Sequence, residues 1–460
     1  MEEKEEQKKK FCDRIIEVLK DFIIKADSMK EYVFSAMNEQ TKKLISFMKK
    51  SNKEVSLLSE LFVDKDTIES TAQIEIDLEN YKNLQDKIKG TSYCSKLVIN
   101  GEIVSLISAF DYFLRDLLKE TCIFQYEEFN NFSNIKDIAL KFGEIKNCNS
   151  IDEVKNYCIE KYLDGLFAGS HDFIFEEIKN KFNVKDIKNH NHYKDLLFVT
   201  ELRNIIVHND SQISIMFRNK MDELKIDYKQ YGMIDDNGIV KINPNNIEYI
   251  FEILIFCAIY ISLSFAIQFS KKNKDELENF LSNINDIGLN CINRHYKISI
   301  ELYDCLLKMA KSSSDKFLYT INKCIALKDG NQITEMENQL NSLDWSNCNN
   351  SFKFAKNCLL NEYDEAIEFL KKRSTEEKEE WKFNLQVWPL CKQLVKSEVF
   401  LKEYPIIFDE EFENKIKVWE NTKKDLDEIE KEIRKMIESK ESHRSKNKVK
   451  QDESTNKEEN

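Results

Sequence analysis

The stretch Tyr193–Asn209 (YKDLLFVTELRNIIVHN) has the pattern of a helix with two unlike sides. At about 100° per residue, one arc of the helix is apolar. That arc collects Phe198, Val199, Leu202, Ile205 and Ile206. The other arc carries Arg203, Asn204 and His208. A helix with one apolar arc must bury it against other elements. The stretch therefore predicts a helical bundle that presents these three polar groups at its surface.

Composition points to helices throughout the chain. Glycine (9) and proline (3) are scarce among 460 residues, and 42% of the residues are hydrophobic. Sharp turns and hairpins need glycine and proline, so the sequence predicts an all-α protein. The net charge of -13 argues against a general nucleic-acid coat protein, which needs excess Lys and Arg to neutralise phosphates. A local basic site remains compatible with this charge.

The cysteines and the N-terminus predict a cytoplasmic protein. Twelve cysteines are scattered singly, without a CxxC pair. We expect them to be reduced thiols, mostly buried. Residues 1–10 mix Glu and Lys and lack the apolar core of a signal peptide.

The most apolar stretch of the chain is 253–267, in which only Ser262 and Ser264 are polar. A transmembrane helix needs about 20 apolar residues, and Glu252 and Gln268 bracket this stretch too closely. We therefore expect a buried core helix and no membrane contact, with a membrane span as the alternative.

Four regions follow from changes in the pattern. Residues 1–90 form an N-terminal helical region, in which apolar side chains recur at alternating steps of three and four: Ile15, Leu19, Phe22, Ala26, Met29, Val33 and Met37. Amphipathic helices are favoured there over a coiled-coil arm, because the repeat does not persist for several further heptads. Gly90-Thr91-Ser92 is expected to end this region.

Residues 91–271 form the second region. A helix is predicted from Glu102 to Glu120, with an inner arc of Ile103, Leu106, Ile107, Phe110, Leu114, Leu117 and Leu118. After the motif helix, segments 231–234 and 238–242 flank Asp235-Asp236-Asn237, which predicts a small β-hairpin. Asn243-Pro244 then has the pattern of a helix start.

Residues 272–418 form a C-terminal helical domain. The stretch 351–370 resembles a tetratricopeptide-type helical hairpin, with small Ala355 and Ala366 where its two helices approach. A weaker helix pair over 315–340 is expected to stack on it. Such hairpins offer a surface for a protein partner. Residues 419–460 are almost wholly charged or polar, and the last part should be disordered.

Asp111 stands inside the apolar stripe of the helix 102–120, four residues after Ile107 and three before Leu114. A buried unpaired carboxylate costs several kcal/mol, so Asp111 needs a partner. Arg203 or protonated His208 would complete a site, whereas Arg115, one turn away, would make a purely structural pair. Leu197 and Val207 fall among the polar groups of the motif helix, as at a cleft or a subunit contact.

Taken together, Ser108–Arg115 and the later Arg203-Asn204-(three residues)-His208 resemble a HEPN domain. The signature of that family is Arg, about four to six residues, then His, commonly with Asn, Asp or His directly after the Arg. Here Asn204 follows Arg203. A polar or acidic residue on an earlier helix often joins the site, and Asp111 matches that place. The resemblance covers residues 95–271 and implies a HEPN-like helical bundle.

The resemblance implies a metal-independent endoribonuclease without a cofactor, active as a toxin or antiphage defence effector. In such an enzyme the 2′-hydroxyl of RNA attacks the adjacent phosphate and leaves a 2′,3′-cyclic phosphate. His208 would transfer protons, Arg203 would stabilise the developing charge, and Asn204 would orient the phosphate or His208. A homodimer is implied as well, because active HEPN proteins commonly place two motifs face to face.

Two alternatives keep the fold and change the function. In one, the HEPN-like core is a non-catalytic dimerising scaffold, and residues 272–418 bind a protein partner. In the other, the chain is a nucleotide-binding partner of a nucleotidyltransferase. His190 and His192 lie too close together on a loop for a good pair of helical metal ligands, so no metal site is predicted. The chain has no phosphate-binding glycine loop.

Overall fold

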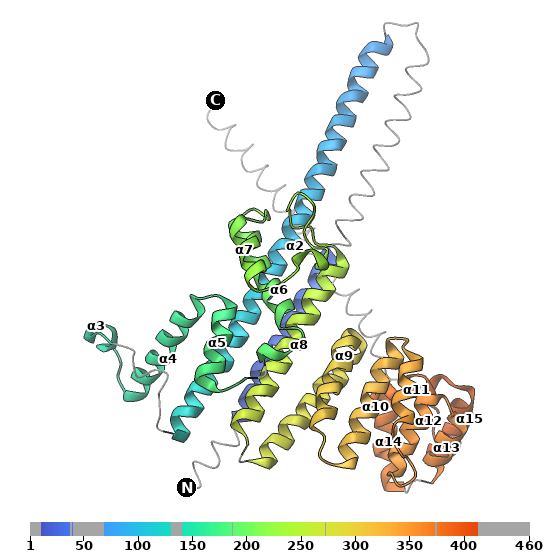
Figure 1. Ribbon diagram of the computed structural model, residues 1–460. Coiled ribbons are helices and arrows are strands. Elements are labelled where there is room, and N and C mark those ends of the chain that lie inside the picture. Colours follow the sequence, from blue (N-terminus) through green and yellow to red (C-terminus); the bar gives the residue numbers. More distant parts are fainter. Residues whose placement is uncertain are drawn as a thin grey trace, which may run out of the picture. The chain divides into compact units, whose positions relative to one another are not determined.

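The computed structural model describes residues 11–36, 39, 69–129, 140–185, 187–271, 273–372 and 375–412. Every regular element in these ranges is an α-helix or a short 3-10 helix, which confirms the predicted all-α fold. The chain divides into two compact units, with the division between Leu306 and Leu307 (Figure 1). Each unit is described by itself below.

The N-terminal unit contains the helix 11–36 and a series of labelled helices. These are α2 (Glu69–Phe129), α3 (Phe142–Ile145), α4 (Ile151–Phe167), α5 (His171–Phe182), η1 (Ile187–Asn189), α6 (Tyr193–His208), α7 (Ile215–Glu223), η2 (Tyr228–Tyr231), α8 (Pro244–Phe269) and most of α9 (Lys274–Met309). α2 packs on α4, α6 and α8, and α6 also packs on α5 and α8. The motif helix therefore lies inside a bundle (Figure 1).

The core of this unit follows the predicted pattern closely. All seven apolar residues expected on the inner arc of 102–120 are at most 2% exposed. The motif helix, predicted over Tyr193–Asn209, is α6 at Tyr193–His208. Burying a large apolar side chain contributes about 1.5–3 kcal/mol relative to leaving it exposed. The stripe on α2 and the apolar arc of α6 thus hold the bundle together.

α8 is the hydrophobic helix predicted over 253–267. The Asn243 side chain accepts a hydrogen bond from the backbone N–H of Asn246, and Pro244 occupies the first turn, as the sequence indicated. Most side chains in this stretch are buried, including Leu254, Ile255 and Ile259 at 0% exposure. By length and composition alone, Lys96–Gln125 and Asn245–Phe269 could each cross a membrane, and 39% and 78% of their most apolar windows are buried in the protein.

The helix 11–36 belongs to this same unit and is not a region apart. Five of the apolar residues predicted from the repeat are buried, namely Ile15, Leu19, Phe22, Ala26 and Val33, whereas Met29 is half-buried and Met37 lies outside the described residues. The Phe11 ring stacks on Phe124 of α2 at 4.3 Å between centroids. The buried stripe of the helix 11–36 thus packs on α2.

α2 continues through Gly90-Thr91-Ser92, where the sequence indicated a break. A glycine inside a helix costs only about 1 kcal/mol relative to alanine, and Thr and Ser cost less. Three weak helix formers within 61 helical residues are therefore tolerated. Among the α2 side chains that the structure describes, Ile103 is the first that is buried.

The small β-hairpin is present only as isolated bridges between strands too short to count as a sheet. Ile234 pairs with Val240, and Gln212, directly after the motif helix, pairs with Ile239. The turn closes through a hydrogen bond from the Gly238 N–H to the Asp235 carbonyl at 2.8 Å. Gly238 has φ of +78°, which side chains resist. The hairpin therefore anchors the loop that follows α6.

α9 bends sharply at His295, where φ is -145° and ψ is 54°. The two halves fold against each other, because the Ser299 hydroxyl donates to the Gly288 carbonyl at 2.8 Å. His295 is buried in the bend, and its Nε2 lies 2.9 Å from Oδ1 of Asp27 on the helix 11–36. The bend thus ties the helix 11–36 to the unit at a second place.

The C-terminal unit consists of further short helices. They are α10 (Ser313–Asp329), α11 (Ile333–Asn341), α12 (Asn350–Leu360), α13 (Tyr363–Lys371), α14 (Thr375–Val387), η3 (Pro389–Lys392), η4 (Leu394–Lys396) and α15 (Glu398–Phe408). The predicted hairpin is α12 and α13, with Ala355 and Ala366 at 0% exposure. α10 and α11 form the second pair, and α10 packs on α12. The tail from 419 lies outside the described residues.

The bend of α9 leads to a prediction about Gly288. A Cβ at this position would lie 3.0 Å from both Leu302 Cδ2 and the Tyr303 hydroxyl oxygen, which itself donates to the Asn285 carbonyl. Gly288→Ala should therefore lower the free energy of unfolding by about 1–3 kcal/mol. Gly101→Ala is the matched control, because nothing lies within 4 Å of its Cβ and alanine favours the helix.

The four tryptophans (Trp345, Trp381, Trp388 and Trp419) all lie beyond the division between the units. Urea unfolding followed by circular dichroism should show an earlier transition for Gly288→Ala, while the tryptophan fluorescence transition stays in place. An unchanged circular dichroism transition would contradict the close packing of the two halves of α9.

Candidate functional site

The middle of α6, residues 196–202, is buried on all sides. Phe198, Val199 and Leu202 are buried, as the helical wheel predicted, but Leu197 is also buried at 3% exposure. The expectation that Leu197 faces a cleft or a partner is therefore wrong. The reason is that α2, α5 and α8 all contact this helix, so its buried arc is wider than a single stripe. Val207 remains 50% exposed, since the last turn emerges from the bundle.

The three motif residues lie where α6 leaves the core. Asn204 and His208 are exposed and one turn apart on the same face. Arg203 is half-buried, and its Nε atom is fully buried. Within the described part of the chain, that Nε has no hydrogen-bond partner. Arg203 as a whole is half-buried and forms no ion pair among the described residues, so its charge is available to an anion at the surface.

Glu201 is buried at 8% exposure and links α6 to α7. It accepts hydrogen bonds from Lys220 of α7 and from the Asn204 amide, the latter at 3.3 Å. The carboxylate therefore holds the Asn204 amide in place and neutralises the nearby lysine. The helical wheel placed Glu201 on the polar side, and the sequence contained no sign that α7 covers it.

The loop after His208 is held in a strained conformation. Asp210 and Ser211 have φ of 46° and 65°, a region that residues other than glycine rarely occupy. Ser211 is buried, its hydroxyl accepts from the Asn100 amide at 3.1 Å, and its carbonyl accepts from the Val240 N–H at 2.8 Å. A strained backbone conformation of this kind persists only where several surrounding contacts hold it in place. These contacts fix the end of α6 that carries His208.

Asp111 does not make the contact predicted for it. Its Oδ1 lies 2.7 Å from Nε2 of His171, at the start of α5. Among the described residues, no hydrogen bond or ion pair joins Asp111 to Arg203 or His208. Arg115, the structural alternative, pairs instead with Glu160 and Asp164 of α4. The Asp111 carboxylate has a partner, as expected, but that partner is His171, because α5 packs against this face of α2.

The other end of α6 is fixed by a partly buried polar network. His192 lies between two carboxylates, with Nδ1 2.7 Å from Asp195 and Nε2 2.6 Å from Glu301 of α9. The hydrogen bonds from Asp195 and Glu301 raise the pKa of His192 to about 9. The Tyr231 hydroxyl also donates to Asp195, at 2.7 Å. A charged, hydrogen-bonded network thus sets the start of the motif helix.

No thiol in the core is activated as a nucleophile. The cysteines are all free, as predicted, and seven of them are buried. Burial raises the pKa of Cys122 and of Cys291 to about 12, which keeps these thiols protonated at neutral pH. Among the described residues, no group of three or more His, Cys, Asp and Glu side chains is arranged to hold a metal ion.

The arrangement at the end of α6 can bind an anion and transfer a proton. Arg203 offers an unpaired guanidinium, Asn204 a held amide and His208 an exposed imidazole, all on a helix fixed at both ends. Sequence reasoning found these three residues but missed Glu201, Lys220, Ser211 and Asn100 as their supports. No known protein family, curated protein or solved structure matches the chain.

The network at His192 predicts a pH-dependent stability. Because the pKa of about 9 in the folded protein exceeds the unfolded value of about 6.5, the protonated form stabilises the fold. This contribution is fully present below about pH 6.5 and is lost as the pH rises through 9. We expect the N-terminal unit to lose stability on the order of 3 kcal/mol across that range.

The measurement is the urea midpoint of this unit, followed by circular dichroism, at pH 6 and at pH 9.5. His192→Gln keeps hydrogen-bonding capacity but cannot titrate, so its midpoint should depend less on pH. If the urea midpoint changes with pH by the same amount in both proteins, His192 does not cause the pH dependence of stability.

Proposed function

We propose that the chain is a metal-independent endoribonuclease of the HEPN type, acting through Arg203, Asn204 and His208. The observation that supports this proposal most is that Arg203, half-buried next to the exposed Asn204 and His208, forms no ion pair among the described residues. Structural arginines in bundles pair with carboxylates, as Arg115 does here with Glu160. An arginine left unpaired beside an exposed histidine suits a phosphodiester better than a structural role.

In this proposal the RNA supplies its own nucleophile. His208, at the exposed end of α6, accepts the proton of the 2′-hydroxyl and then donates it to the leaving 5′-oxygen. The 2′-oxygen forms a bond to phosphorus as the bond to the 5′-oxygen breaks, which leaves a 2′,3′-cyclic phosphate. Arg203 stabilises the added negative charge on the phosphate oxygens, and Asn204 orients the phosphate. No external water or metal enters this step.

The proposal includes a homodimer and a biological role as a toxin or defence effector. Val207, Ile215 and Met216 are 50%, 76% and 81% exposed and lie at or just after the motif helix. Exposed apolar side chains beside a polar site suit a contact between subunits. Asp111, paired with His171, is left out of the chemistry and serves to join α2 to α5.

The test is cleavage of total RNA by the purified chain in the presence of EDTA. We expect cleavage that leaves 2′,3′-cyclic phosphate ends. His208→Ala should reduce the rate by about 100-fold or more, and Arg203→Ala by a similar factor. Thermal melting should show that both variants fold, because both side chains lie at the emerging end of α6.

Arg218→Ala is the matched control, because it removes an exposed arginine of nearby α7 and should leave the rate unchanged. Asp111→Asn should leave the cleavage rate unchanged and lower the melting temperature. A loss of cleavage at an unchanged melting temperature would show that Asp111 is part of the catalytic site. Cleavage that needs a metal, or that survives His208→Ala, would refute the ribonuclease.

A folded protein without cleavage would favour the non-catalytic alternative. The feature in its favour is the stack of α10 and α11 on α12 and α13, which forms the kind of helical surface that binds peptides. In that case the motif helix would be a dimerising scaffold. Expression of the intact chain would then leave growth unaffected, with or without Arg203→Ala.

A further inference from the structure

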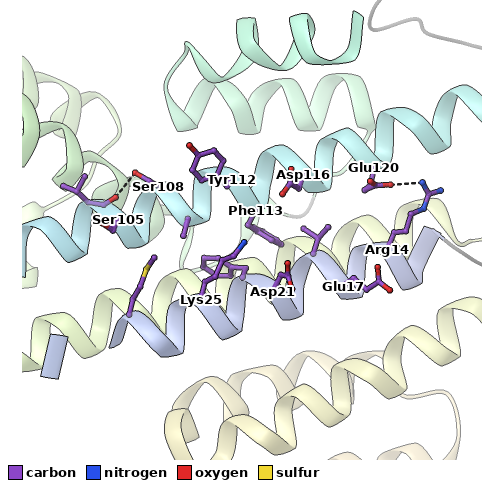
Figure 2. A pocket seen from close by; sticks show the side chains of 15 residues that line it. Arg14, Glu17, Asp21, Lys25, Ser105, Ser108, Tyr112, Phe113, Asp116 and Glu120 are labelled. Carbon is purple, nitrogen blue, oxygen red and sulfur yellow. Dashed lines mark hydrogen bonds and ion pairs between the residues drawn. The ribbon is translucent and has the colours of Figure 1, made fainter. Parts of the chain in front are cut away.

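A groove separate from the motif residues runs between the helix 11–36 and α2 (Figure 2). The two helices are antiparallel, since Arg14 pairs with Glu120 near one end and Phe22 contacts Phe110 further along. The groove has a volume of about 940 Å³. None of the motif residues lines it.

The floor of the groove is apolar. Phe22 and Phe113 form its centre, with ring centroids 5.3 Å apart, and Val18 and Met29 extend it along the helix 11–36. The side of α2 presents small side chains at Ser105, Ser108 and Ala109, next to Val104 and Tyr112. Small residues beside an aromatic floor leave room for the side chains of another element.

The walls of the groove are acidic. Glu17 and Asp21 are one turn apart on the helix 11–36, and Asp116 and Glu120 are one turn apart on α2, as Figure 2 shows. Glu120 is paired with Arg14 at 2.8 Å. Among the described residues, Glu17, Asp21 and Asp116 form no ion pair. Lys25 is the cation facing them.

Asp116 has a pKa raised by burial. Although part of the residue faces solvent, burial against the groove raises its pKa, and the positive charges of Lys119 and Lys25 only partly oppose that rise. A carboxylate held in this state would be stabilised by an added cation. The groove therefore favours a ligand that carries positive charge at its edges.

The length of the groove indicates the shape of that ligand. From Arg14 to Met29 the lining follows the helix 11–36 for about 22 Å, or roughly four helical turns. An amphipathic helix fits such a trough, with its apolar face on the floor and its flanking side chains at the walls. Basic flanks would meet the carboxylates on both sides.

We propose that the groove between the helix 11–36 and α2 docks a basic amphipathic α-helix of a protein partner. The carboxylates of the groove oppose the approach of other negatively charged surfaces. The phosphates of nucleic acid and the anionic headgroups of a membrane are opposed for the same reason.

The probe is a fluorescein-labelled peptide of Leu and Lys, about five helical turns long, with Leu at helical spacing. Its binding to the full chain is measured by fluorescence anisotropy at about 50 mM and about 300 mM NaCl. A peptide with Glu in place of every Lys is the matched probe. We expect the Lys peptide to bind, more weakly at the higher salt, and the Glu peptide not to bind.

Variants distinguish binding of the peptide in the groove from its nonspecific attraction to the negative charge of the chain. Asp21→Asn with Asp116→Asn should weaken binding by about tenfold or more through lost charge pairs. Ser108→Trp should weaken it by filling the groove, with unchanged thermal melting as the check on folding. Asp13→Asn is the matched control, an exposed carboxylate on the same helix outside the groove lining.

Binding that survives both groove changes, or that falls equally with Asp13→Asn, would overturn the proposal. So would the failure of the Lys peptide to bind the unmodified chain. Tight binding of vesicles with anionic headgroups or of single-stranded RNA, lost in Ser108→Trp, would assign the groove to another class of ligand and also overturn it.

Discussion

The burial of α6 among α2, α5 and α8 is the constraint on which the N-terminal unit depends. Residues 196–202 of this helix are all buried, and the last turn carries Asn204 and His208 into solvent. Close packing of the enclosed turns leaves α6 little freedom to shift or rotate. The positions of Arg203 and His208 are therefore set by the core and not by their own contacts.

Both ends of α6 are held by polar contacts that complement this packing. At its start, protonated His192 bridges Asp195 and Glu301 and so joins α6 to α9. At its end, the strained residues Asp210 and Ser211 are fixed by Asn100 and the hairpin at Val240. Rigid placement of this kind is what a catalytic group needs, because small displacements cost large factors in rate.

Much of this structure could be predicted from local patterns in the sequence. The apolar stripe at 102–120, the start of α8 at Asn243-Pro244 and the α12–α13 hairpin are visible because each depends on residues close together in the chain. Contacts between segments distant in the chain could not be predicted from the sequence. The partner of Asp111 proved to be His171, 60 residues away, and Glu201 is covered by α7 in a way that no helical wheel shows. The bend of α9 at His295 lacks a proline or glycine signal at that residue.

The proposed function assigns Arg203, whose Nε has no hydrogen-bond partner among the described residues, to a phosphate of RNA. NMR detection of arginine Nε–H groups tests this claim directly, with Arg203→Lys assigning the signal. On addition of a 2′-O-methyl RNA oligonucleotide, which cannot attack its own phosphate, the Arg203 signal should shift and the Arg115 signal should not. An Arg203 signal that stays unchanged while the oligonucleotide binds would contradict the account.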